Sequence, residues 1–132
     1  SLVSAVTQAP VGFLVDRLGP RRVLTAGLLL GGTAYAAFAV FGGYTWLILA
    51  GALAGLANAT YHPADYAILN GVVGGARMGR AFSFHTFAGY AGGAVAPALM
   101  LGMAAVFGVA GAVFAAGPIA GAAAAAVWLS CP

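Results

Sequence analysis

Four long apolar stretches take up most of this chain of 132 residues. They cover residues 23–41, 46–69, 81–106 and 109–130. Each is long enough to approach or exceed the roughly 20 helical residues that cross the hydrocarbon core of a bilayer. Residues 1–15 form a shorter stretch, which we interpret as the end of a further span. Because lipid offers the backbone no hydrogen-bond partners, these stretches must be helices or strands of a closed barrel.

The composition separates these two possibilities and excludes other classes of protein. Five residues are Lys or Arg, two are Asp or Glu, and the mean hydropathy is +1.02. A soluble domain carries about 25% charged residues, which this chain lacks. Barrel strands alternate polar and apolar residues, and residues 100–129 do not. Few, clustered arginines also argue against nucleic acid as a partner. We predict an all-α, polytopic transmembrane helix bundle embedded in a lipid bilayer.

The basic residues indicate how the bundle lies in the membrane. All are arginines, and they fall in residues 16–22 and 70–80: Arg17, Arg21, Arg22, Arg77 and Arg80. Two predicted spans separate the two segments, so both lie on the same side. The excess of arginine in cytoplasmic loops makes that side cytoplasmic. The sequence therefore predicts a multi-pass protein of the cell inner (plasma) membrane with two cytoplasmic loops.

One of these loops carries a pattern that basic charge alone does not explain. Residues 12–24 read GFLVDRLGPRRVL, with glycines and an acid at fixed offsets from the arginines. The stretch resembles the signature loop between spans 2 and 3 of the major facilitator superfamily. The matching positions are Gly12, Leu14, Asp16, Arg17, Gly19, Arg21 and Leu24, while Pro20 stands at a usually basic position. The resemblance implies a gating loop formed by Gly12, Asp16, Arg17, Gly19, Arg21 and Arg22.

Two further segments extend this resemblance over most of the chain. Residues 55–65 (GLANATYHPAD) and 78–99 (MGRAFSFHTFAGYAGGAVAPAL) resemble spans 4 and 5 of the fosmidomycin-resistance-like branch. The second segment partly resembles the family's antiporter motif, although Ala96 stands where a glycine usually precedes the proline. The resemblance implies a partial N-terminal half of a twelve-helix fold, from the end of span 2 to span 6. Spans 8 to 12 are the alternative, because the signature loop can recur.

Polar side chains inside the predicted spans mark a candidate pathway. Asn58, Tyr61, His62 and Asp65 are spaced so that they share one face of a helix, and His85 lies early in the next span. Ionisable groups are costly in a membrane and by default indicate a substrate or proton pathway. Histidine changes its charge near neutral pH, so His62 and Asp65 suit a proton-responsive pair. The alternative places Asp65 at the membrane interface beside Arg77 or Arg80, with both histidines hydrogen-bonded between helices.

Small residues recur at four-residue spacing in every complete span. The pairs are Gly27 and Gly31, Gly51 and Gly55, Gly89 and Gly93, and Gly117 and Gly121. Such pairs let helix backbones approach closely. We predict helix packing at Gly89 and Gly93 and a bend at Pro97, and we interpret Trp128 as an interfacial anchor.

These features favour a secondary transporter that moves an unidentified small molecule by alternating access. Proton-coupled efflux is one form that such transport can take. Its partners are the substrate, protons, the lipid bilayer and the remainder of its own chain. We expect no catalytic residue, cofactor or metal. One alternative is an intramembrane protein in which His62 and His85 ligate a metal or haem. The other is a helical membrane scaffold without transport activity.

Overall fold

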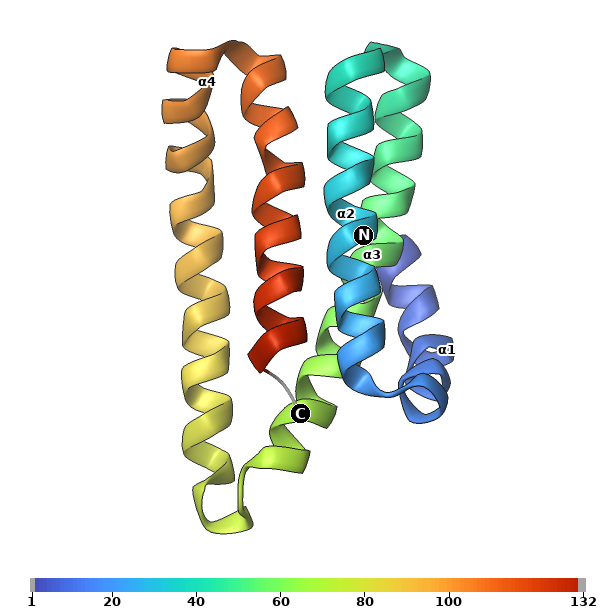
Figure 1. Ribbon diagram of the computed structural model, residues 1–132, viewed down its shortest axis with the longest axis vertical. Helices are drawn as coiled ribbons and strands as arrows, with labels where there is room; N and C mark the ends of the chain where they lie inside the picture. The colour runs from blue at the N-terminus through green and yellow to red at the C-terminus, as the bar shows by residue number, and fades with distance from the viewer. Residues whose placement is uncertain (1, 131–132) are drawn as a thin grey trace.

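The computed structural model describes residues 2–130, with side chains from residue 10 onward, and every element in this part is helical (Figure 1). The elements are α1 (Leu2–Leu18), α2 (Pro20–Phe41), α3 (Gly43–Val72), the 3-10 turn η1 (Gly75–Arg77) and α4 (Met78–Ser130). α4 turns back at Gly108 and therefore has two antiparallel limbs, residues 78–107 and 109–130 (Figure 1). The predicted all-α bundle is confirmed. Residue 1 of the first predicted span lies outside the described residues.

Two of the reversals depend on glycines in the left-handed region of backbone conformation. Gly19 separates α1 from α2 with φ 86°, and Gly108 separates the two limbs of α4 with φ 74°. Their ψ angles are 143° and 166°, and a residue with a Cβ atom is strained by roughly 1–3 kcal/mol at positive φ with such an extended ψ. Pro20 follows Gly19 as the first residue of α2, where the missing N–H has no helical partner in any case. The chain can therefore turn without a long loop.

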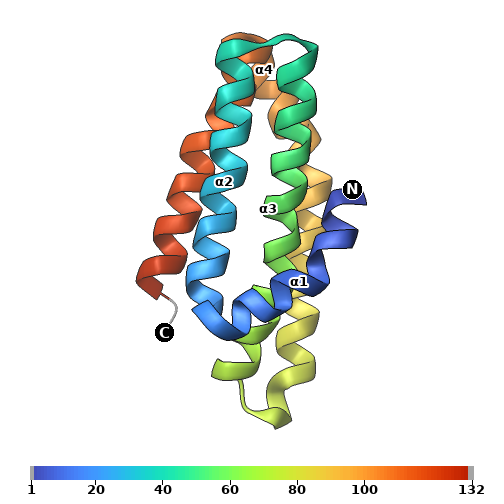
Figure 2. The ribbon, with the colours of Figure 1, turned by 90° about the vertical axis from the view of Figure 1, so that its right-hand side faces the viewer.

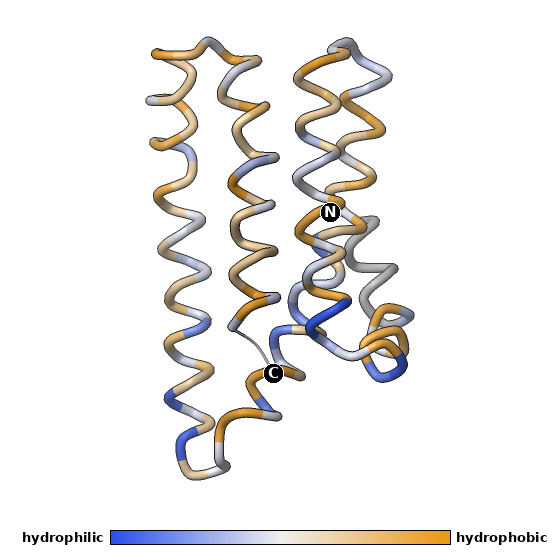
Figure 3. The backbone as a smooth tube through the Cα atoms, viewed as in Figure 1, coloured by the Kyte–Doolittle hydropathy of each residue, from blue (hydrophilic) through white to orange (hydrophobic). Residues whose placement is uncertain are grey.

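The helices extend further than the predicted spans at the end of the bundle that carries the arginines. α1 includes Asp16 and Arg17, and α2 begins at Pro20, so Gly19 alone connects them where the sequence predicts a loop of residues 16–22. Similarly, residues 73–77 connect α3 to α4 where we expected a loop of residues 70–80. The turn predicted near Gly108 is present. Polar residues gather towards the end of the bundle that carries the Gly19 turn and the α3–α4 connection, opposite the Gly108 turn (Figure 3).

α2 packs between α3 and the second limb of α4, and glycines allow the close approach on both sides. A Cβ atom added at Gly27 would lie 1.9 Å from Thr60 Oγ1 of α3. On the other side, a Cβ atom at Gly32 would lie 2.7 Å from Ala120 Cβ and 3.2 Å from the carbonyl oxygen of Gly117. Small residues at such contacts are the usual means by which helices associate in lipid. Glycine is therefore required at Gly27 and Gly32.

α1 lies obliquely against α3 and completes an apolar cluster near the Gly19 turn (Figure 2). The buried members of the cluster are Val11, Val15, Val23, Leu24, Ala59 and Ala64. They come from α1, α2 and α3, so this cluster fixes the three helices relative to one another. The buried side chains of the signature stretch therefore pack against α3.

The first limb of α4 is exposed along most of its length. A Cβ atom at Gly89 or Gly93 would meet nothing within 4 Å, and Pro97 continues the helix on an exposed stretch. Helix packing at these residues therefore stays a prediction that concerns partners beyond the described chain. Gly51 and Gly121 also face open space, whereas Gly31 lies against α3.

Two stretches of the described chain are long and apolar enough to span a membrane, Pro20–Phe41 and Gly75–Ser130. The second contains both limbs of α4. α3 is long enough but carries Asn58, His62 and Asp65 in its second half. Polar groups of this kind are costly in lipid unless they face the interior of the bundle.

Candidate functional site

The polar face of α3 contributes to two separate pockets. Asn58 and Tyr61 line a pocket of about 380 Å³ between α2 and α3, and Tyr35 of α2 lies on its opposite wall. His62 lines a second pocket, of about 350 Å³, between α3 and the first limb of α4. We name these the tyrosine pocket and the histidine pocket. Of the four residues predicted to share a helix face, Asn58 and Tyr61 line one pocket, His62 lines the other, and Asp65 lines neither.

An ion pair connects α3 to the first limb of α4 beside the histidine pocket. Asp65 Oδ2 lies 3.6 Å from His85 Nε2, with the side chains 25% and 32% exposed, respectively. The pair is charged only when His85 is protonated. The interfacial alternative, in which Asp65 pairs with Arg77 or Arg80, is not what the structure has. Because α3 and α4 otherwise contact each other little, this pair is a principal contact between them.

Tyr66 lies at the centre of the histidine pocket, and the sequence reasoning missed it. Its ring centroid lies 5.7 Å from that of His62, 6.0 Å from that of His85 and 5.0 Å from that of Phe82. The rings of Tyr66 and His85 are nearly perpendicular, at 73°. Tyr66 follows His62 by four residues, and this helical spacing was the available signal. Thr86, Gly89 and Tyr90 complete the lining of the pocket.

The tyrosine pocket contains uncharged hydrogen-bonding groups. Tyr61 is partly buried, and a Cβ atom at Gly31 would lie 3.2 Å from its hydroxyl oxygen. Gly51 and Gly55 form part of the wall contributed by α3. Glycines leave room there, so the tyrosine hydroxyl groups are accessible to a molecule in the pocket. Tyr35, like Tyr66, was not among the predicted site residues.

The signature stretch, residues 12–24, surrounds the Gly19 turn and lines neither of these two pockets. Asp16 and Arg17 are exposed, and neither makes an ion pair among the residues that the structure describes. Arg22 borders an apolar pocket of about 380 Å³ between α1, α2 and α3. A Cβ atom at Gly12 would meet no neighbour within 4 Å. The stretch therefore exposes Asp16, Arg17 and Arg22.

The side chain of Arg21 joins this stretch to the second limb of α4. Its guanidinium carbon lies 4.2 Å from the centroid of the Trp128 ring, and its Nη2 donates a hydrogen bond to the Trp128 carbonyl oxygen. A cation over an indole ring is attracted by the negative face of the ring. A cation near the last carbonyls of a helix also interacts favourably with the helix dipole. Trp128 therefore has a specific partner, and its interfacial position stays a prediction.

The two histidines share a pocket, but the described residues hold no group of three or more His, Cys, Asp or Glu side chains suited to a metal ion.

A family model described as Major Facilitator Superfamily matches residues 1–132, the whole length of the chain. No curated protein and no solved structure matches it. The matched region contains both pockets, the Asp65–His85 pair and the Gly19 turn.

Proposed function

Because the chain belongs to the major facilitator superfamily, a family of membrane transporters, we propose that it couples small-molecule transport to proton binding at the Asp65–His85 pair. Family membership makes the protein membrane-embedded and a transporter of small molecules rather than an enzyme. Our proposal concerns the coupling ion, the residues and the direction. The observation that carries it is the ion pair that bridges two weakly packed helices beside a pocket.

The pair can change the contact between α3 and α4 when a proton binds or leaves. With His85 protonated, the imidazolium and the Asp65 carboxylate attract each other across 3.6 Å. Loss of that proton removes the attraction and leaves a carboxylate beside a neutral ring. His62, Tyr61 and Tyr66 are the other titratable side chains near this pair within the described chain. Proton release therefore weakens the contact between α3 and the first limb of α4 and leaves the packing of Tyr66 against Phe82 as a contact between them.

The gating loop formed by residues 12–22 controls access from one side. Gly19 supplies the turn, and Asp16 and Arg17 present their charges outward to a part of the protein that closes against them. Arg21 ties the turn to Trp128 at the end of α4. In this proposal the Gly19 turn and the α3–α4 connection are cytoplasmic and the membrane is the cell inner membrane, as the arginine distribution favours.

In this proposal each of the two pockets binds a different part of the substrate. The tyrosine pocket, with Asn58 and Tyr61, binds uncharged polar groups, and the histidine pocket binds an ionisable group beside His62. The segments 55–65 and 78–99 support placement in the fosmidomycin-resistance-like branch, with export as the direction. Fosmidomycin, a small anionic compound, is therefore the first probe to use.

The proposal is tested with the full-length protein in proteoliposomes under an imposed pH gradient. Fosmidomycin accumulation should be saturable in the wild type and at least about ten-fold lower in His85→Gln. The matched control is Ser83→Ala in the same limb, because the Ser83 hydroxyl only donates to the Gly79 carbonyl oxygen at 2.9 Å. Equal accumulation by wild type and His85→Gln contradicts the coupling role. A non-transporting scaffold predicts no flux with any probe.

A further inference from the structure

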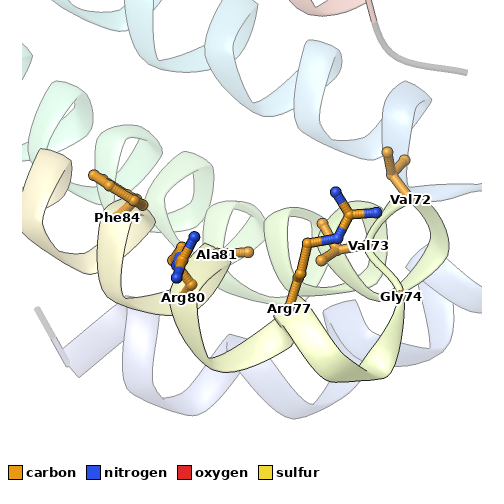
Figure 4. A pocket seen from close by; sticks show the side chains of 7 residues that line it. All are labelled: Val72, Val73, Gly74, Arg77, Arg80, Ala81 and Phe84. Carbon is orange, nitrogen blue, oxygen red and sulfur yellow. The ribbon is translucent and has the colours of Figure 1, made fainter.

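The connection between α3 and α4 carries a pocket that the proposed transport cycle does not use. It has a volume of about 300 Å³ and is open to the surroundings at the arginine-rich end of the bundle. Two of the five arginines of the chain, Arg77 and Arg80, line it together. Figure 4 shows both side chains on the same side of the connecting segment, between Phe84 at one end and Val72 at the other.

Local backbone structure brings the two arginines together. The 3-10 turn Gly75–Arg77 leads directly into α4, and the backbone N–H of Arg77 donates to the Gly74 carbonyl oxygen at 2.9 Å. Arg80 follows three residues later in the first turn of α4, and residues at this spacing are neighbours on a helix surface. The first N–H groups of α4 add a partial positive charge at the same place.

The positive charge of this pocket has no acidic partner in the part of the chain that the structure describes. Both arginines are exposed, and neither forms an ion pair there. Of the two acids in the sequence, Asp65 contacts His85, and Asp16 lies in α1 beside the Gly19 turn. The pocket is therefore a doubly charged site suited to an anion with several oxygen acceptors, such as a phosphate group.

Exposed apolar side chains flank the charge and point to the source of the phosphate. Val72 is 60% exposed and Phe84 is 68% exposed. Phe84 lies one helical turn beyond Arg80, about 6 Å further along the limb that enters the membrane. Along η1 and the first limb of α4, the charged arginines therefore come before the apolar side chain of Phe84. A phospholipid has the same order, with a charged headgroup followed by apolar acyl chains. A free phosphate would gain nothing from Phe84 or Val72.

We propose that Arg77 and Arg80 bind the phosphate of an anionic phospholipid whose acyl chains lie along Phe84 and Val72. Basic pockets at the ends of transmembrane helices bind anionic headgroups in this way. Two guanidinium groups favour a lipid with net negative charge over a zwitterionic one. This site is separate from the Asp65–His85 pair. An experiment can therefore refute the lipid site without refuting proton coupling, and can refute proton coupling without refuting the lipid site.

Native mass spectrometry of the full-length protein, titrated with phosphatidylglycerol or phosphatidylcholine, tests the proposal. The wild type should bind phosphatidylglycerol in preference to phosphatidylcholine. The double substitution Arg77→Gln with Arg80→Gln should weaken phosphatidylglycerol binding by about 30-fold, from the usual contribution of arginines near an anionic membrane surface. The matched control, Arg17→Gln with Arg22→Gln, removes the same charge outside this pocket and should weaken phosphatidylglycerol binding far less than the double substitution in the pocket.

Three results would overturn the proposal. Equal losses in both double variants would make the effect one of net charge rather than of this pocket. Competition by millimolar inorganic phosphate, at unchanged affinity in Phe84→Ala, would make the ligand a free phosphate. Equal binding of phosphatidylcholine and phosphatidylglycerol by the wild type would remove the role of the arginines. Thermal unfolding of each variant verifies that it is folded.

Discussion

Replacing Gly27 by alanine should destabilise the α2–α3 contact, although alanine is the better helix former. The added Cβ atom would lie 1.9 Å from Thr60 Oγ1, 3.0 Å from Thr60 Cβ and 3.3 Å from the Ala57 carbonyl oxygen. The last atom is backbone, so the two helices must separate. Overpacking costs about 1–3 kcal/mol, and the closeness of the hydroxyl indicates the upper part of that range. The gain in helix propensity offsets about 1 kcal/mol, which leaves a net loss of about 1–2 kcal/mol.

A double-mutant cycle isolates the steric term. The Thr60 hydroxyl donates at 2.7 Å to the carbonyl oxygen of Ala57 in its own helix, so Thr60→Ala alone should cost little. Removing the hydroxyl relieves the shortest contact of Gly27→Ala, and the two substitutions should couple by at least about 1 kcal/mol. The free energy of unfolding is measured by SDS titration in mixed micelles, followed by far-UV circular dichroism.

Gly121→Ala is the matched control, because its Cβ atom would meet nothing within 4 Å. It should leave the free energy of unfolding unchanged or raise it by up to about 1 kcal/mol. If Gly27→Ala is as stable as Gly121→Ala, or if its loss persists fully without the Thr60 hydroxyl, the close approach of α2 and α3 is refuted.

Three further predictions concern the turn, the Arg21 contact and the histidine pocket. Gly108→Ala should lower the free energy of unfolding by about 1–3 kcal/mol because its φ is 74° and its ψ 166°, whereas Gly102→Ala should not; SDS titration distinguishes them. Arg21→Gln should lower it by about 1 kcal/mol and shift the emission of Trp128, and an unchanged spectrum would contradict the stacking. Tyr66→Leu should weaken fosmidomycin binding at least about five-fold, roughly 1 kcal/mol, in an equilibrium binding assay, and unaltered affinity would exclude Tyr66 from the site.

The sequence was sufficient to predict features that depend on local chemistry. The length of the apolar stretches predicted the helices. The glycine between the last two stretches, Gly108, predicted the reversal of the chain at that residue. The pattern of residues 12–24 indicated the family that the match over the whole chain supports. Each of these signals lies within one short segment of sequence, so tertiary structure does not alter it.

Features that depend on which helices become neighbours were not predictable from spacing. Glycine pairs look alike in the sequence, yet Gly27 lies against Thr60 while Gly89 faces open space. Asp65 had arginines close to it in the sequence, but the arrangement of α3 and α4 places His85 beside it instead. Tyr66 carries no charge that would single it out in the sequence. Its place in the histidine pocket is seen from its ring contacts with His62 and His85.

Proton coupling through Asp65 is tested most directly by comparing two transport modes in one variant. Proteoliposomes with the full-length protein are assayed for fosmidomycin exchange at equal pH and for accumulation under a pH gradient. We predict that Asp65→Asn retains exchange, because the variant remains folded and binds substrate, and loses accumulation by at least about ten-fold. Ser83→Ala should retain both modes. Accumulation by Asp65→Asn at the wild-type level would contradict the account.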